Sequence, residues 1–358
     1  MNVKIATAQY DISFLENWQQ YQSKVERWVR DAAQQDAKIL LFPEYASMEL
    51  ASLFIARDGV YAVSLPGAGS AIARDGVYAV SLPGAGSAIA RDGVYAVSLS
   101  GAGSAIARDG VYAVSLSGAG SAGEAVYSSL SKQLVDMQSL LDDYLDLFQM
   151  LATKYQCIIQ AGTFPVQTDS GAYRNRAYLF MPNGQFDYQD KLMMTRFENE
   201  QWLIQSGEEL RCFDSEYGKI AINICYDSEF PLLARKQVEA GANLILVPSC
   251  TDTLAGYHRV KIGCQARALE NQCYVAQAAL VGNAPWSEAV DVNIGAAAVY
   301  TPVDRGFPDN GILAAGKLNA VQWVVAEVSL GACATVREQG QVFNYKDWPL
   351  QQAFVMRS

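Results

Sequence analysis

The sequence predicts an α/β protein built in layers. Short apolar runs, typical of buried strands, alternate with stretches whose apolar residues recur at helical spacing, and a series of strand candidates closes the chain. A hairpin signal is also present at 210–225, where two strand candidates flank the turn Tyr217-Gly218. The predicted fold therefore combines strands that alternate with helices and some antiparallel pairing.

The first elements illustrate the pattern. Residues 3–9 alternate apolar with small or polar residues, 14–35 carry apolar residues at helical spacing, and 37–43 form an apolar run that Pro43 ends. Further helices are predicted at 131–155, 230–240 and 257–271. Further strands are predicted at 157–164, 174–181, 219–225, 243–248, 273–280, 295–300, 311–315 and 321–328.

Residues 55–122 differ from the rest of the chain. A 17-residue unit occurs there four times in tandem, beginning at Ile55, Ile72, Ile89 and Ile106. Each unit combines an Asp-Gly turn signal, a short strand candidate and a Gly/Ala/Ser-rich turn, which favours a β-meander or small β-solenoid, with a flexible loop as the alternative. The near-identity of the copies indicates a recent duplication or an engineered array.

The array interrupts an otherwise continuous pattern. We therefore divide the chain into a main domain of residues 1–54 and 123–358 and an inserted array at 55–122, placed in a surface loop where insertions are best tolerated.

Composition excludes several classes of function. The net charge of −10 argues against nucleic acid or an anionic membrane surface as the main partner. No apolar run is long enough to span a bilayer, and the start of the sequence enters a strand without a signal-peptide layout. Seven scattered cysteines without a C-x-x-C pair do not resemble a disulfide framework, and a single histidine argues against a zinc site. We expect a cytoplasmic protein with reduced thiols and no metal.

Three reactive side chains follow strand candidates. Glu44 comes directly after the strand at 37–43, Lys191 follows a strand-like segment, and Cys225 ends the strand at 219–225. Each has an ordinary interpretation, as a surface acid, a solvated lysine and a packed thiol. Together they supply what a thiol nucleophile needs, because a carboxylate can accept the thiol proton and an ammonium can stabilise the charge that develops on an attacked carbonyl.

The motifs around these residues resemble those of the nitrilase, or carbon–nitrogen hydrolase, superfamily. They are Phe42-Pro43-Glu44, Asp190-Lys191-Leu192 and Ile224-Cys225-Tyr226-Asp227-Ser228-Glu229-Phe230-Pro231, together with the segments 248–252 and 266–271. The resemblance covers the whole chain apart from 55–122, and the motifs occur in the family's order. It implies a four-layer α-β-β-α sandwich.

The resemblance also implies a mechanism. Glu44 corresponds to the general base, Lys191 to the group that stabilises the tetrahedral intermediate, and Cys225 to the nucleophile. Glu198 matches a glutamate that orients substrate and lysine, and the backbone N–H of Tyr226 matches a further oxyanion donor. The implied reaction is hydrolysis of a non-peptide amide or carbamoyl bond through a cysteine thioester, with release of ammonia and without a metal or organic cofactor. A homodimer or larger homo-oligomer is implied as well.

Residues next to the nucleophile bear on the substrate. Tyr226-Asp227 resembles the amidase-like branches, which act on linear amides, whereas Trp-Glu is typical of nitrile-cleaving members. Many of those branches carry Arg where Glu229 stands, which puts in doubt a scheme in which this position pairs with a substrate carboxylate. If Glu229 lines the pocket, it favours a neutral or cationic group. If it faces a helix or a dimer interface, it says nothing about the substrate.

Other hypotheses stay open. A Cys-His enzyme would need His258, which lies within a predicted helix, where packing or solvent exposure is the ordinary interpretation. Cys250 also ends a strand and could lie near the pocket, but we favour a structural role for it. Two further functions are a catalytically silent scaffold whose repeat array mediates assembly, and acyl transfer in which an amine replaces water on the same triad.

Overall fold

A computed structural model describes most of the main domain and part of the predicted array. The described residues are 2–57, 61–64, 70–74, 77–81, 94–99, 102–108, 113–115, 130–354 and 356. Most of the connections in the array at 55–122 lie outside these residues, so its architecture and boundaries stay a prediction. The short strands assigned in this part are β3 Tyr61–Ser64, β4 Ser70–Arg74, β5 Val77–Ser81, β6 Val94–Leu99, β7 Ala102–Arg108 and β8 Ala113–Ser115.

The main sheet is organised around its first strand. Its strands are β1 Asn2–Asp11, β2 Ala37–Phe42, β9 Ile158–Gln167, β10 Tyr173–Phe180, β11 Phe186–Asp190, β12 Cys212–Phe213, β13 Lys219–Ile222, β14 Ala242–Ser249, β15 Tyr274–Asn283, β16 Val292–Asn293, β17 Ala298–Tyr300, β18 Ile312–Ala315 and β19 Gln322–Ser329. One half of the sheet runs β19–β1–β2–β9–β10–β11, and the other runs β12–β13–β14–β15–β17–β18. The last residues of β1 pair in parallel with β15 and so join the two halves.

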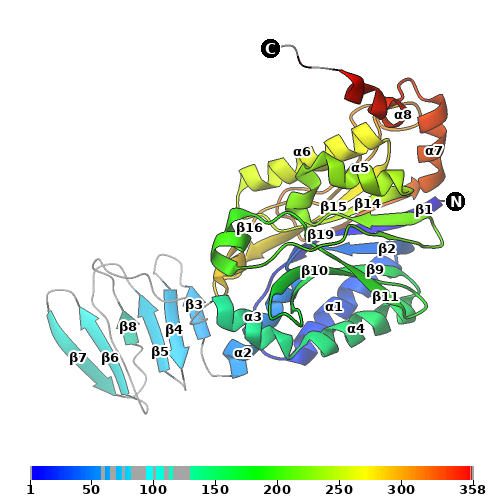
Figure 1. The fold of residues 1–358 in the computed structure, drawn as a ribbon. Helices are drawn as coiled ribbons and strands as arrows, with labels where there is room; N and C mark the ends of the chain where they lie inside the picture. The colour runs from blue at the N-terminus through cyan, green and yellow to red at the C-terminus, as the bar shows by residue number, and fades with distance from the viewer. Residues whose placement is uncertain are drawn as a thin grey trace.

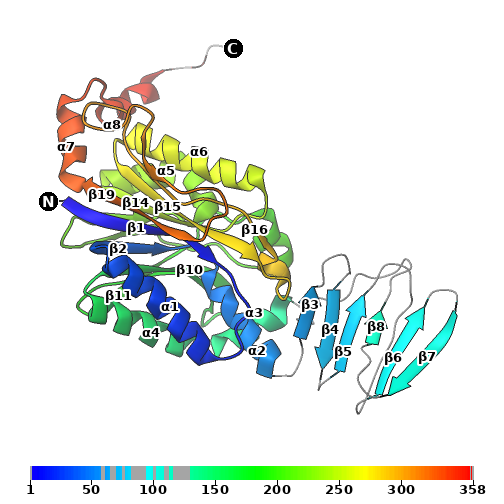
Figure 2. The same ribbon diagram turned by 180° about the vertical axis from the view of Figure 1, so that it is seen from behind.

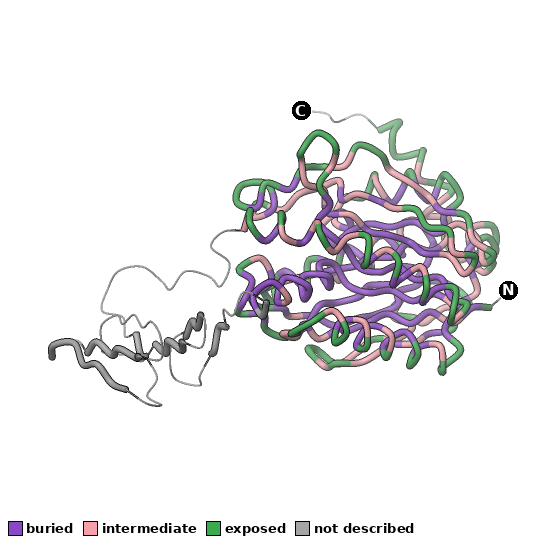
Figure 3. Tube along the Cα trace, turned by 90° about the horizontal axis from the view of Figure 1, so that it is seen from below, coloured by how far each residue is buried: buried purple, intermediate pink, exposed green. Residues whose placement is uncertain are grey.

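Helices cover both outer faces of this sheet. Helices α1 Trp18–Ala33 and α4 Leu141–Tyr155 lie on one face, and α5 Pro231–Glu239 and α6 Leu254–Asn271 lie on the other (Figures 1 and 2). The residues of the strands between these helices are mostly buried (Figure 3). The four-layer α-β-β-α arrangement that the resemblance implies is therefore confirmed.

Alternation along β1 explains the layers. Ala6, Ala8 and Tyr10 belong to the core beneath α1 and α4, whereas Val3 and Ile5 belong to the core shared with the second half of the sheet. Successive side chains of a strand point to opposite faces, so a strand with apolar residues at every position must be covered on both sides. The near-continuous apolar runs of the sequence have this physical cause.

One predicted helix differs in the structure. The helix predicted at 131–155 is divided into α3 Leu130–Gln138 and α4, because Leu140 N–H bonds to the Met137 carbonyl in a tighter turn. The Gln138 side chain donates to the Pro165 carbonyl and accepts from the Gln167 N–H of β9. These bonds depend on tertiary contact, which helical periodicity does not report.

The sequence pattern also missed several short elements. After β19 the chain forms α7 Leu330–Gln339, α8 Asn344–Asp347 and η5 Trp348–Ala353. The others are η1 Ala46–Leu50, α2 Ala51–Arg57, η2 Glu198–Trp202, η3 Cys225–Glu229 and η4 Glu288–Val290. No helix in the described residues is long and apolar enough to cross a membrane.

A buried ion pair holds the segment that follows Glu44. The Lys24 ammonium contacts the carboxylate of Glu49 in η1, and both side chains are almost fully buried. Glu49 also accepts from the Tyr10 hydroxyl at 2.7 Å and from the Ser13 N–H at 2.7 Å. Burial raises the pKa of Glu49, while Lys24 opposes the rise. The carboxylate therefore depends on its counterion.

We expect Lys24→Met to lower the free energy of unfolding by about 3–5 kcal/mol, because it leaves the Glu49 charge buried without a partner. Denaturant unfolding measures the loss. The matched control is Lys154→Met, which removes the solvent-exposed pair with Glu26 and should lower the free energy of unfolding far less. Equal losses in the two variants would contradict the assignment of Lys24 as a structural counterion.

Candidate active site

Glu44 lies at the carboxyl end of β2, on a turn shaped by its neighbours. Tyr45 has a left-handed φ of 57°, and its N–H donates to the Thr163 hydroxyl at 2.9 Å. Gly162 in β9 has a φ of 77°, and a Cβ there would approach the Pro43 carbonyl oxygen to 2.3 Å. Only glycine lets β9 come this close. The turn directs the Glu44 side chain into the protein, where it is buried.

Lys191 directly follows β11. Its N–H donates to the Asn175 carbonyl at 2.9 Å. One residue earlier, Asp190 accepts two bonds from the Arg176 guanidinium, at 2.7 and 2.9 Å. Bidentate arginine–carboxylate pairs are geometrically specific, so this pair fixes β11 against β10 at the point where Lys191 enters the interior.

Cys225 begins the short helix η3 after β13. Its φ of 48° is in the left-handed region, which a residue with a side chain adopts only when the surrounding structure enforces it. Asp227 provides part of that enforcement, because its carboxylate accepts the Ile224 N–H at 3.1 Å and the Met193 N–H at 2.7 Å. Asp227 thus ties the turn of the cysteine to the segment of Lys191. Burial raises the pKa of Asp227 to about 7.

The three residues converge on one cavity. Lys191 Nζ lies 2.7 Å from Glu44 Oε1, and the Glu44 charge acts on the Cys225 thiol, whose pKa it raises. The thiol also donates to the Cys250 carbonyl at 3.5 Å. All three line a cavity of about 600 Å³. The structure therefore brings together the nucleophile candidate, the base candidate and the cation that the sequence analysis singled out.

Glu198 completes a buried charge cluster. Lys191 Nζ lies 2.9 Å from its Oε1 and 2.7 Å from its Oε2. The Tyr45 hydroxyl donates to Glu198 at 2.6 Å and the Thr195 N–H donates at 3.0 Å. Burial raises the pKa of Glu198, but Lys191 and these donors outweigh burial, so the pKa lies below its ordinary value. Glu198 is a carboxylate at neutral pH.

The protonation states follow from burial and pairing. Burial lowers the pKa of Lys191, yet Glu198, Glu44 and Cys225 raise it well above its ordinary value, so the ammonium persists. Burial raises the pKa of Glu44, with Lys191 opposing and Glu198 adding to the rise. Burial and Glu44 also raise the pKa of the Cys225 thiol, against Lys191. The resting thiol is therefore protonated and needs a base to become a nucleophile.

Two hydrogen-bond donors to Glu44 were not predicted from the sequence. Asn175 in β10 donates to Glu44 Oε1 at 2.8 Å and to Glu198 Oε1 at 3.1 Å. The backbone N–H of Cys250, at the end of β14, donates to Glu44 Oε2 at 3.1 Å. A polar residue within a buried strand is a usable signal for Asn175. A backbone donor such as that of Cys250 leaves no trace in the side-chain pattern.

Of the other residues discussed in the sequence analysis, some line this cavity and one does not. Tyr226 and Glu229 both line the cavity, and Glu229 Oε1 lies 3.5 Å from Arg259 Nε of α6. Cys250 lines the cavity as well, and its thiol lies 3.1 Å from the Asn293 side chain. His258 is exposed on α6, outside the residues that line the cavity.

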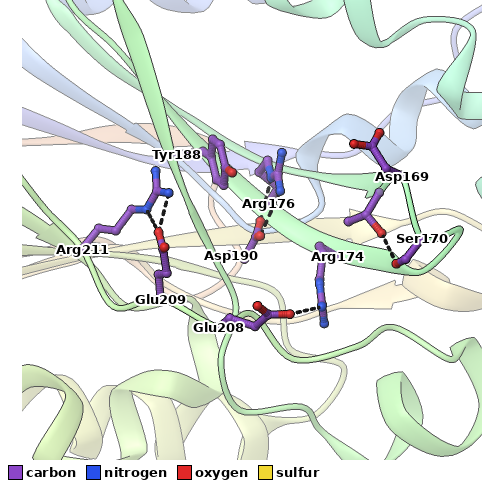
Figure 4. A pocket seen from close by; sticks show the side chains of 10 residues that line it. Asp169, Ser170, Arg174, Arg176, Tyr188, Asp190, Glu208, Glu209 and Arg211 are labelled. Atoms are coloured by element: carbon purple, nitrogen blue, oxygen red, sulfur yellow. Dashed lines mark hydrogen bonds and ion pairs between the residues drawn. The ribbon is translucent and has the colours of Figure 1, made fainter.

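A second cavity lies on the outer surface of β10 and β11 (Figure 4). Its arginines are already paired. Arg174 contacts Glu208 at 3.2 Å, Arg211 contacts Glu209, and Arg176 contacts Asp190 and stacks on Tyr188. Each guanidinium thus has an acidic partner, and this cavity contains no cysteine. The nucleophile candidate, Cys225, lines the first cavity.

Comparison with known proteins identifies the family. The family model described as carbon–nitrogen hydrolase matches residues 114–338, which include Lys191 and Cys225. "Probable hydrolase YhcX" of Bacillus subtilis is 40% identical over 206 residues, which cover 58% of this chain and 40% of that protein. A "Deaminated glutathione amidase" of Dictyostelium discoideum is 34% identical over 151 residues, which cover 41% of this chain and 48% of that protein. The chain thus spans about half the length of these curated relatives, or less.

Solved structures share the fold at low sequence identity. The Nit3 protein of Saccharomyces cerevisiae, a member of the nitrilase superfamily, has a TM-score of 0.58 at 18% identity, with 94% of this chain and 93% of that chain covered. An amidase from Nesterenkonia in complex with butyramide has a TM-score of 0.58 at 14% identity, with 99% and 97% covered. With the family match extending over more than half of the sequence, the conclusion is direct: this chain belongs to the carbon–nitrogen hydrolase family.

Proposed function

We propose that this protein hydrolyses the carbon–nitrogen bond of a small non-peptide amide or carbamoyl compound through a thioester on Cys225, with release of ammonia. The observation that carries the proposal is that the buried Glu44–Lys191 ion pair and the Cys225 thiol line one cavity. A base, a cation and a nucleophile in one cavity are the parts that acyl transfer requires.

In the first half-reaction, Cys225 Sγ attacks the amide carbon and its proton passes to the Glu44 carboxylate. The negative charge moves to the substrate oxygen, where the Lys191 ammonium and the Tyr226 N–H stabilise it. Glu44 then gives its proton to the departing nitrogen, the carbon–nitrogen bond breaks, and ammonia leaves. A raised pKa suits Glu44 to this task, because a stronger base accepts the thiol proton more readily.

In the second half-reaction, water attacks the thioester carbon and Glu44 accepts its proton. The carbon–sulfur bond breaks, the sulfur regains a proton, and the carboxylic acid leaves. Lys191 stabilises the oxyanion again. Its three N–H groups all contact Glu44 or Glu198 in the resting site, so donation to the substrate oxygen requires exchange of one of the two bonds to Glu198. In this scheme Glu198 positions Lys191.

Association of two copies through the layer formed by α5 and α6 is a further part of the proposal. Large apolar side chains are exposed on α5 and α6, namely Leu232, Leu254, Ile262 and Leu269. Leu254, Ile262 and Leu269 recur at helical spacing and so share one side of α6. Contiguous exposed apolar surface marks interaction sites, and a second copy is the partner that the family resemblance implies.

We expect Cys225→Ala to reduce ammonia release to background and Glu44→Gln to reduce it by about 10²–10⁴-fold, because the first removes the nucleophile and the second removes the base. A panel of amides and carbamoyl compounds, assayed for ammonia, supplies the measurement. Chromatography of the acid product separates hydrolysis from transfer to an added amine.

The matched control is Cys212→Ala, which removes a thiol on β12 outside the cavity and should leave turnover unchanged. Circular dichroism checks that each variant is folded. Full activity in folded Cys225→Ala protein would refute the proposal.

We expect kcat/KM to fall as the pH falls through the pKa of Glu44, since the base must be a carboxylate to act. Burial raises this pKa, so the acid limb should lie above the ordinary glutamate value of 4.5. Deprotonation of Lys191 should not lower kcat/KM below pH 10.5, its ordinary pKa, because the pKa of Lys191 is raised. The measurement is the pH profile of kcat/KM, with folding checked at each pH. An acid limb at or below pH 4.5, or the same limb in Glu44→Gln, would count against Glu44 as the base.

We expect Ile262→Glu to weaken self-association, because a charge on α6 would be buried at the contact. Sedimentation velocity measures the oligomer, and Val135→Glu, which places the same charge on exposed α3, is the control. A monomeric unmodified protein, or an unchanged oligomer in Ile262→Glu, would exclude this surface as the contact.

A further inference from the structure

The charges that line the active-site cavity are unequal. Its acidic residues are Glu44, Glu198, Glu229, Asp252, Glu288 and Asp291, and its basic residues are Lys191, Arg196 and Arg259. Every one of the three cations already has an acidic partner. Lys191 contacts two glutamates, Arg196 forms a bidentate pair with Glu200, and Arg259 pairs with Glu229.

The pair of Glu229 and Arg259 decides which charge is available near the nucleophile. Glu229 lies in η3, four residues after Cys225, and is less exposed than Arg259, with 22% against 61% of the side-chain surface exposed. Burial raises the pKa of Glu229 and Arg259 lowers it. A substrate carboxylate at this wall would have to displace Glu229 from Arg259 and face its like charge, which is unfavourable.

Three acids in the lining have no cationic partner. Asp252, Glu288 and Asp291 are exposed, and within the described residues none of them forms an ion pair. Asp252 comes shortly after β14, whereas Glu288 and Asp291 belong to η4 and its C-terminal cap, so two separate segments contribute acids to the same cavity. A cavity lined by one sign of charge concentrates ligands of the opposite sign.

Resting on the proposed hydrolysis, we infer that the cavity selects amides that carry a cationic amine at the end remote from the reacting carbon and discriminates against those that carry a carboxylate there. The reacting carbon binds at Cys225, and the ammonium group lies toward Asp252, Glu288 and Asp291. Arg259 acts as a specificity residue by holding Glu229 and contributes no free cation. The cavity of about 600 Å³ accommodates such a small extended molecule.

The test uses three amides of matched length: 5-aminopentanamide with an ammonium end, hexanamide with a methyl end, and glutaric monoamide with a carboxylate end. We expect kcat/KM to fall in this order, with at least a tenfold difference between the first and the last, carried mainly by KM. The difference should shrink at high salt, because exposed charges are screened. Calorimetric dissociation constants for the same amides with Cys225→Ala should follow the same order without turnover.

Variants assign the effect to residues. Glu288→Gln with Asp291→Asn should raise KM for 5-aminopentanamide several-fold more than KM for hexanamide. Arg259→Gln should lower KM for 5-aminopentanamide, because it frees Glu229. Asp169→Asn, which removes one negative charge beside the second cavity, is the matched control and should change neither value.

The outcomes separate this inference from the proposed function. Two outcomes would overturn the inference and leave the proposed function standing. One is hydrolysis of hexanamide without a preference for the ammonium compound. The other is tightest binding of the carboxylate compound, with that binding weakened in Arg259→Gln. Binding to Cys225→Ala in the expected order without ammonia release from any amide overturns the proposed hydrolysis and supports the selectivity. Absence of any binding order overturns the inference.

Discussion

The ammonium of Lys191, buried between Glu44 and Glu198, is the interaction on which the site depends. An isolated charge in the interior is costly, and removal of one partner from a buried pair leaves the other uncompensated. Here one cation faces two carboxylates, so the cluster keeps a net negative charge next to the Cys225 thiol. The surrounding donors, Asn175 among them, satisfy the remaining oxygen lone pairs.

The fold brings the ends of three strands together at this site. Glu44 follows β2, Lys191 follows β11 and Cys225 follows β13, and these strands come from both halves of the sheet. Two devices keep the ends aligned. Asp227 links the turn of Cys225 to the backbone at Met193, and the Arg176–Asp190 pair fixes the entry to Lys191. Both act through hydrogen bonds with fixed geometry, which leaves the reactive side chains little freedom.

The sequence pattern predicted the regular elements and the candidate residues at the strand ends, because residue type reports which side chains are buried and how they alternate. It did not predict the break at Leu140, where a tight turn interrupts an unbroken helical period. Nor did it reveal the donation from the Cys250 N–H to Glu44, since every residue but proline has such a donor and only position decides its use. For Glu229 two orientations stayed open, and the structure shows that it lines the cavity and pairs there with Arg259.

The sequence by itself determined the layered α/β class and the family resemblance and singled out the three candidate reactive residues, because each rests on local composition and on motif order. Tertiary structure alone decided that these residues share one cavity, that Lys191 contacts two carboxylates, and that Arg259 is already paired. The physical reason is distance along the chain. Glu44 and Lys191 are separated by 147 positions, and only the packing of two sheet halves brings groups so far apart in sequence to 2.7 Å.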